Sequence, residues 1–220
     1  NQGLWGTSVG GSETLTSDQP LPDSAYPSAL EKEKEEAISL TFTRGELTEV
    51  NGEKGTQVAL IQTLQNQAKQ FAIGRDIHVG DTIIGIKGRV GFEAAAPAII
   101  IKAHHLLEKH TLSKWQQFQK EQLSNFYGMQ LHEGHYLDPV MRDMEAFMES
   151  SQKKVNGTVY IKLYPYRFEL LGIRSPNDLM QAEFGSYGEM NKGWTAEEAK
   201  GFIKLTANAT KIYQHLNKEQ

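Results

Sequence analysis

The order of hydrophobic periodicities along the chain constrains its fold more than any other feature of the sequence. Hydrophobic residues alternate at every second position in some segments, as in half-buried strands, and recur every three or four positions in others, as in amphipathic helices. The two kinds of segment come in blocks, without strict β-α-β alternation. This order favours an α+β fold, in which antiparallel hairpins form a sheet packed with helices, followed by a long C-terminal helix.

Two stretches have the alternation of a β-hairpin. The first turns near Arg44-Gly45, and the second turns around Pro165-Tyr166. Residues 74–87 also alternate like strands, and a glycine followed by an aspartate at positions 80 and 81 predicts a turn there. These segments supply the antiparallel strands.

Helical spacing marks residues 58–72, residues 95–110 and two later helices. Ser113, with Gln116 three residues on, forms a capping box that begins the third helix. Asp138 with Pro139 begins the fourth. The expected apolar faces are Val58, Ile61, Leu64, Ala68 and Phe71 on the first helix, Trp115, Phe118 and Phe126 on the third, and Val140, Met144, Phe147 and Met148 on the fourth.

A last helix begins at Thr195, where Glu198 completes another capping box. Its apolar residues step 3-4-3-4, which is the spacing of a packing seam. They are Phe202, Leu205, Ala209, Ile212 and Leu216. Such a seam either folds back on its own core or packs on another subunit, and spacing alone does not decide between them. We therefore divide the chain into a domain of residues 1–192 and a C-terminal helix of residues 193–220.

Composition excludes several classes of function. The net charge of −4 argues against a nucleic-acid partner, and no apolar run reaches the length of a membrane span. The chain has no cysteine, which excludes disulfides and thiolate metal sites. The order His105, Glu108, His110 lacks the His-x-x-x-His spacing of zinc proteases, so we expect no metal site. Nucleotide-binding and Ser-His-Asp motifs are missing, so no residue is assigned as catalytic.

One pair of cations stands out in a strand-like run. Lys87 and Arg89 lie two residues apart, so their side chains share one face of the strand. They could bind an anion, or they could hold loop carbonyls or a carboxylate such as Glu93. The residues alone favour the second role.

Five ordered segments resemble the argininosuccinate synthase family. They are LWGTS at 4–8, IGIKGRVGFEAAAPA at 84–98, AHHLLEKHTL at 103–112, NGTVYIKLY with LLGIRSPNDL at 156–179, and AEEAKGFIKL at 196–205. Each is weak alone, but together they cover nearly the whole chain in the order of the family. The resemblance implies the C-terminal, synthetase half of the enzyme, and the start at Asn1 inside the first motif predicts a piece of a longer protein.

The family joins citrulline and aspartate at the expense of ATP, in arginine biosynthesis in the cytoplasm. The resemblance implies that ATP, with magnesium, binds to the other half, that this chain alone is inactive and binds no cofactor, and that the C-terminal helix joins a homotetramer. It also implies citrulline contacts at Ser8, Gly80 and Phe92. Lys87 and Arg89 match the family pattern and are expected beside that pocket.

Two of these contacts depart from the family pattern, which has glutamate at Gly80 and tyrosine at Phe92. Loss of both polar groups predicts a modified, N-acylated citrulline as the substrate, with Lys87 or Arg89 meeting any added carboxylate. The alternative is a shifted alignment near Gly80, with Asp76 or Asp81 as the missing carboxylate. A further alternative is a stand-alone binding or oligomerisation module that has lost catalysis.

Overall fold

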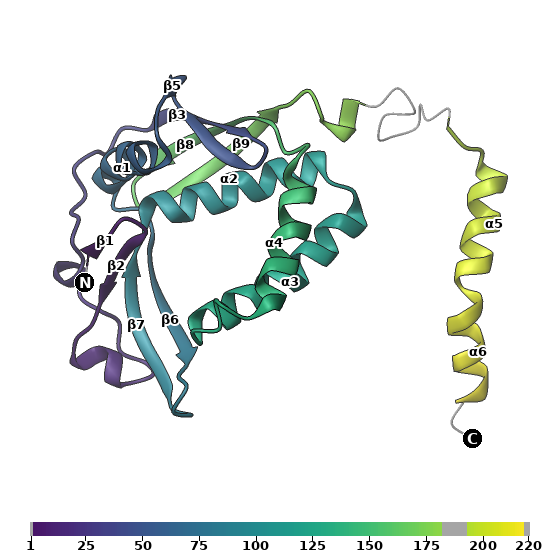
Figure 1. Ribbon diagram of the computed structural model, residues 1–220, viewed down its shortest axis with the longest axis horizontal. Helices are drawn as coiled ribbons and strands as arrows, with labels where there is room; N and C mark the ends of the chain where they lie inside the picture. The colour runs from purple at the N-terminus through teal and green to yellow at the C-terminus, as the bar shows by residue number, and fades with distance from the viewer. Residues whose placement is uncertain (1, 182–192, 218–220) are drawn as a thin grey trace. The chain divides into compact units, whose positions relative to one another are not determined.

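The structure is a computed structural model that describes residues 2–181 and 193–217, without the side chains of Gln2 and Gln181 (Figure 1). The chain divides after Asp178 into two compact units. The first holds two antiparallel sheets and four α-helices, and the second holds the C-terminal helix. The predicted α+β class is confirmed, with the strands arranged in two sheets.

The larger sheet has the strand order β5-β4-β3-β8-β9. Its strands are β3 (Glu36–Thr43), β4 (Glu46–Val50), β5 (Glu53–Lys54), β8 (Gly157–Tyr164) and β9 (Arg167–Arg174). Both predicted hairpins are confirmed. Arg44 and Gly45 take positive φ angles of 52° and 80°, as a tight two-residue turn requires, and Tyr166 takes 64° in the second turn.

Two helices, α1 (Gln57–Ala68) and α2 (Ala95–Thr111), cover this sheet and complete the hydrophobic core. Period-two alternation places Ile38, Leu40 and Phe42 of β3 in that core. The expected face of α1 is partly wrong, because Val58 is half exposed and Leu60 is buried instead. At 100° per residue the two lie about 200° apart around the helix, so they cannot share one face.

The helices α3 (Lys114–His132) and α4 (Pro139–Gln152) pack against each other, and both predicted caps are confirmed. The buried residues of α4 include Met141 and Met144. The expected apolar face of α3 is uncovered, since no residue of this helix is buried within the described chain. The three aromatic residues of the expected face are all exposed: Trp115, Phe118 and Phe126.

The smaller sheet has the order β1-β2-β7-β6, from β1 (Gln2–Gly3), β2 (Gly6–Val9), β6 (Arg75–Asp81) and β7 (Lys87–Glu93). The predicted turn at Gly80-Asp81 is wrong, because both residues pair inside the β6–β7 ladder. The chain turns over residues 82–86 instead. There Thr82 Oγ1 donates to the Ile86 carbonyl at 2.6 Å and Gly85 takes a φ of 81°. Figure 1 shows β7 leading directly into α2.

The second unit begins with a short 3-10 helix, η4 (Leu179–Gln181), and contains α5 (Ala196–Thr206) and α6 (Asn208–Leu216). Ala207 between them is itself helical, so they form one helix in two segments. The Thr195–Glu198 capping box is confirmed. Phe202, Leu205 and Ile212 are all exposed, as is Leu216 at the end of the stripe. Nowhere in residues 2–181 and 193–217 is a helix both long and apolar enough to cross a membrane.

Candidate functional site

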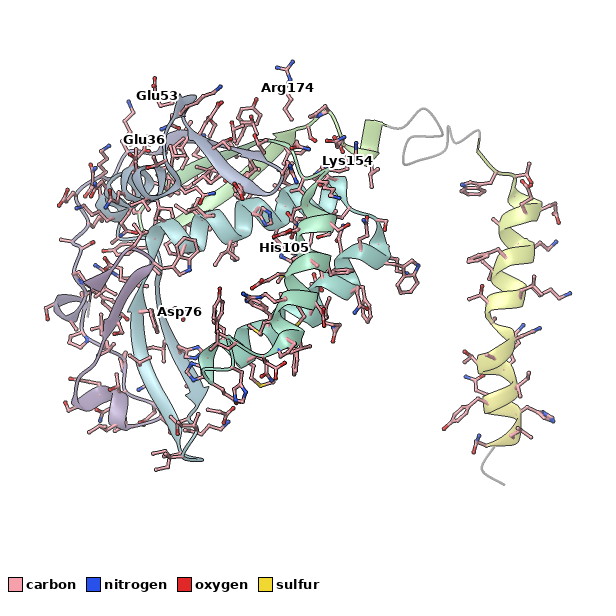
Figure 2. The ribbon with its side chains drawn as sticks, viewed as in Figure 1. Glu36, Glu53, Asp76, His105, Lys154 and Arg174 are labelled. Carbon is pink, nitrogen blue, oxygen red and sulfur yellow. The ribbon has the colours of Figure 1, made fainter. Side chains whose placement is uncertain are left out.

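The register of the smaller sheet puts three residues from distant segments in one row. Ser8 on β2 lies directly opposite Phe92 on β7, and Phe92 lies directly opposite Asp76 on β6. Directly opposite residues of antiparallel strands project from the same face of a sheet. Ser8, Phe92 and Asp76 therefore project side by side from one face; Figure 2 labels Asp76, which marks where the row crosses β6.

Every second residue of β6 after Asp76 projects from the same face of the sheet. His78 lies opposite Val90, and Gly80 lies opposite Gly88. Ser8, Gly80 and Phe92, the three positions implied by the family resemblance, are thus brought onto one face, which we call the open face. Its side chains on β2, β6 and β7 are Ser8, Asp76, His78, Val90 and Phe92.

Asp76 was considered from the sequence only as a replacement carboxylate, and His78 was missed. The signal for His78 was its period-two spacing from Gly80, which places the two on one face of a strand. The imidazole of His78 lies edge to face against the Phe92 ring, with centroids 6.4 Å apart and planes at 85°. An ideal Cβ at Gly80 would lie 2.9 Å from His78 Nε2.

The opposite face of this sheet is covered by the loop of residues 10–30. The guanidinium of Arg89 donates to the carbonyls of Glu13 and Thr16, both at 2.8 Å, and to that of Gln19 at 2.9 Å. Lys87 forms an exposed ion pair with Asp81. Lys87 and Arg89 are thereby kept away from Ser8, Gly80 and Phe92, because residues at odd and even positions of β7 project from opposite faces.

A second ionic group on that covered face joins β6 to β7. Arg75 Nε lies 3.3 Å from the carboxylate of Glu93, which is buried, and Arg75 also donates to the Ser28 carbonyl. The backbone N–H of Ser28 donates to the same Glu93 carboxylate at 3.3 Å. Arg75, Arg89 and Glu93 of the covered face therefore attach the loop, whereas Asp76 and His78 project from the open face.

A separate cavity of about 760 Å³ lies among α1, α2, α3 and the β3–β4 hairpin, with Trp5 at its wall. At its edge the buried carboxylate of Glu108 binds Lys120 Nζ at 2.6 Å and accepts from the Gln152 amide at 2.7 Å. His104 Nε2 lies 2.9 Å from Gln152 Oε1. Burial lowers the pKa of His104, and the Glu108 carboxylate opposes that shift only in part.

The histidine-rich segment of α2 does not converge on one point. His105 Nε2 lies 3.3 Å from Glu121, whereas His110 Nδ1 lies 3.1 Å from Asp178. Among the residues that the structure describes, no three His, Asp or Glu side chains are grouped to hold a metal ion. The cavity thus presents a satisfied polar cluster, whereas on the open face no described residue forms a hydrogen bond or an ion pair with the His78 side chain.

Comparison with known proteins gives one consistent family. The model of the arginosuccinate synthase C-terminal domain matches residues 2–213. Argininosuccinate synthase of Xanthomonas axonopodis pv. citri (strain 306) is 33% identical over 228 residues, covering 99% of this chain and 53% of that protein. Argininosuccinate synthase of Dictyoglomus thermophilum is 33% identical, covering 97% of this chain and 54% of that protein. Argininosuccinate synthase of Methanocaldococcus jannaschii is 30% identical, covering 100% of this chain and 56% of that protein.

The chain spans about half the length of the curated relatives that it matches. The family model extends from the first strand of the smaller sheet to the C-terminal helix, and so includes both compact units. The chain therefore belongs to the argininosuccinate synthase family and corresponds to its C-terminal domain.

Proposed function

We propose that this chain is the substrate-binding and oligomerisation half of an argininosuccinate synthase, with citrulline held on the open face. The observation that carries the proposal is the convergence of Ser8, Gly80 and Phe92, which come from three separate strands, on that one face. The match to the family's C-terminal domain supports the same function. In the complete reaction, citrulline and aspartate are joined at the expense of ATP.

The chemistry divides between two halves of the complete protein. The ureido oxygen of citrulline attacks the α-phosphate of ATP and releases pyrophosphate, and the aspartate amine then displaces AMP. We assign ATP, magnesium and aspartate to the other half. The part of this chain described by the structure groups no carboxylates for a metal ion. Its own contribution is to orient citrulline, through the Ser8 hydroxyl and the wall formed by Phe92.

Assembly is the second role that we propose for the chain. The helix of α5 and α6 exposes Phe202, Leu205, Ile212 and Leu216 along one seam. Burying a large apolar side chain contributes about 1.5–3 kcal/mol, so a seam of this size can hold subunits together. We propose that it forms the contact of a homotetramer.

Two forms of the substrate compete for the open face. Asp76 favours free citrulline, since its carboxylate stands in the row of Ser8 and Phe92 and can meet an ammonium group. The facing pair Gly80 and Gly88 favours an N-acylated citrulline, which has no ammonium group and needs more room. An added Cβ at Gly88 would meet only a methyl group of Thr82, at 3.5 Å, so the face has space at Gly88, whereas the His78 ring lies against Gly80.

The test is pyrophosphate release by the complete protein with ATP, aspartate and one of three substrates: citrulline, N-acetylcitrulline or N-succinylcitrulline. Release with any of them supports the synthase function, and release with none refutes it in favour of a non-catalytic module. A higher kcat/KM for free citrulline than for both acylated forms refutes the acylated substrate. The 220-residue chain alone is expected to release no pyrophosphate, because we place the nucleotide contacts on the other half.

A further inference from the structure

The imidazole of His78 is an unused hydrogen-bonding group on the open face. Its ring is exposed and packs edge to face on the Phe92 ring. No hydrogen bond or ion pair joins it to another described residue. A neutral imidazole offers one N–H donor and one acceptor, and a protonated one offers two donors. His78 therefore brings at least one donor to the face that also carries Ser8.

The glycine at position 80 is what allows the imidazole to lie there. An ideal Cβ at this position would stand 2.9 Å from His78 Nε2, closer than Cβ atoms come to other heavy atoms. A longer side chain at position 80 and the present position of the His78 ring therefore exclude each other. Where the family resemblance puts an anionic glutamate, this chain has an imidazole nitrogen, which in its N–H form can donate a hydrogen bond to an anion.

The other charged groups near His78 leave its far side available to an anion. Lys87 and Asp81 project from the covered face and pair with each other. Among the strand residues that project from the open face, Asp76 carries the carboxylate, whose Oδ1 accepts the backbone N–H of Ile77 at 2.8 Å. Asp76 and Gly80 lie four residues apart on one strand, or about 13 Å at 3.3 Å per residue. An anion above the Gly80–Gly88 pair is thus well separated from Asp76.

We propose that His78 is a specificity-determining residue that donates an N–H to a carboxylate at the end of the substrate's acyl group. The preferred substrate is then a citrulline acylated by a dicarboxylic acid, and a simple acetyl derivative is used less well. This inference rests on the proposed synthase function and on its acylated substrate. The sequence alone suggests Lys87 or Arg89 for the contact with this carboxylate, but both project from the opposite face of the sheet. His78 takes that role here.

The test compares N-succinylcitrulline with N-acetylcitrulline in the complete protein, as wild type and as His78→Ala, His78→Gln and His135→Gln. The wild type is expected to prefer the succinyl form about tenfold in kcat/KM. His78→Ala is expected to lose that tenfold preference, which corresponds to about 1.4 kcal/mol, mainly through KM, and to leave the acetyl form within about twofold. His78→Gln keeps an N–H donor and is expected to retain part of the preference.

The control, His135→Gln, changes an exposed histidine in the α3–α4 connection and is expected to match the wild type. If His78→Ala lowers kcat/KM equally for both substrates, or lowers it for neither, the role of His78 is overturned while the synthase function stands. If His78→Ala does not fold, as judged by circular dichroism, the His78→Gln ratio decides by the same criterion. If free citrulline is the best substrate, the acylated substrate and this inference fall together, but the synthase function survives.

Discussion

Replacing Arg89 by alanine should weaken the fold of this chain without directly removing a substrate contact. The guanidinium of Arg89 ties together the loop of residues 10–20 by donating to three of its carbonyls, at 2.8, 2.8 and 2.9 Å. No other residue is described as donating a side-chain hydrogen bond to the Gln19 carbonyl. The loop in turn covers the face of the smaller sheet opposite to the proposed substrate.

The magnitude follows from the surroundings of these three hydrogen bonds. The bonds to Glu13 and Thr16 are partly buried, and the bond to Gln19 is exposed. Taking about 1 kcal/mol for each partly buried bond and about 0.5 kcal/mol for the exposed one gives a loss of about 2.5 kcal/mol in Arg89→Ala. The released carbonyls lie in a surface loop where water can replace the guanidinium, so no further desolvation cost is added.

Lys87→Ala is the matched control, because Lys87 projects from the same face of the same strand. Its partner is Asp81, and both side chains are largely exposed, so the expected loss is below about 0.5 kcal/mol. Urea unfolding followed by circular dichroism measures both losses, and amide hydrogen exchange in residues 13–19 reports the loop directly. A stability of Arg89→Ala within 0.5 kcal/mol of wild type, combined with a tenfold higher KM for substrate, would refute this reasoning and make Arg89 a ligand.

Three further predictions concern the cavity and the C-terminal helix. Glu108→Ala leaves the Lys120 ammonium without its carboxylate and is expected to lower the free energy of unfolding in urea by about 2–3 kcal/mol. This is less than the usual cost of breaking a buried ion pair, because Lys120 is partly exposed. A loss below about 1 kcal/mol contradicts the prediction. The lowered pKa of His104 means that the unfolded chain takes up the proton first, so stability is lost as pH falls below about 6.5, by at most about 1.4 kcal/mol per pH unit. His104→Gln should flatten that dependence between pH 7 and 5, and an unchanged slope argues against it. Leu205→Glu with Ile212→Glu should lower the molar mass in light scattering, whereas an unchanged mass would rule out assembly through this helix.

Features set by local chemistry were predictable from the sequence. The caps at Ser113, Asp138 and Thr195 depend on side chains within three residues of the helix start. The prediction of a turn at Gly80-Asp81 was wrong because a competing local hydrogen bond, from the Thr82 hydroxyl to the Ile86 carbonyl, stabilises a turn over residues 82–86 instead. The expectation of a packed aromatic face on α3 was wrong for a different reason. Spacing shows which residues share a face, but not whether anything covers that face.

The candidate site needed information that no local pattern contains. Ser8 and Phe92 become neighbours only through the pairing of β2 with β7, and Asp76 joins them only through the register of β6 with β7. The family resemblance supplied Ser8, Gly80 and Phe92 one by one, without their common face. It also pointed to Lys87 and Arg89, but it did not show that these two residues project from the opposite face of the smaller sheet.

The pairing of β3 with β8 has a consequence for how the chain acquires its structure. Thr41 and Thr158 share a hydrogen bond at 2.9 Å although they are 117 residues apart in sequence. Closing so long a loop costs chain entropy before any contact compensates for it, so folding that depends on this pair is slow. During synthesis the β3–β4 hairpin must wait, with one edge of β3 unpaired, until β8 leaves the ribosome. In that interval the edge can pair with another nascent chain, which makes β3 the strand where misassembly is expected to start.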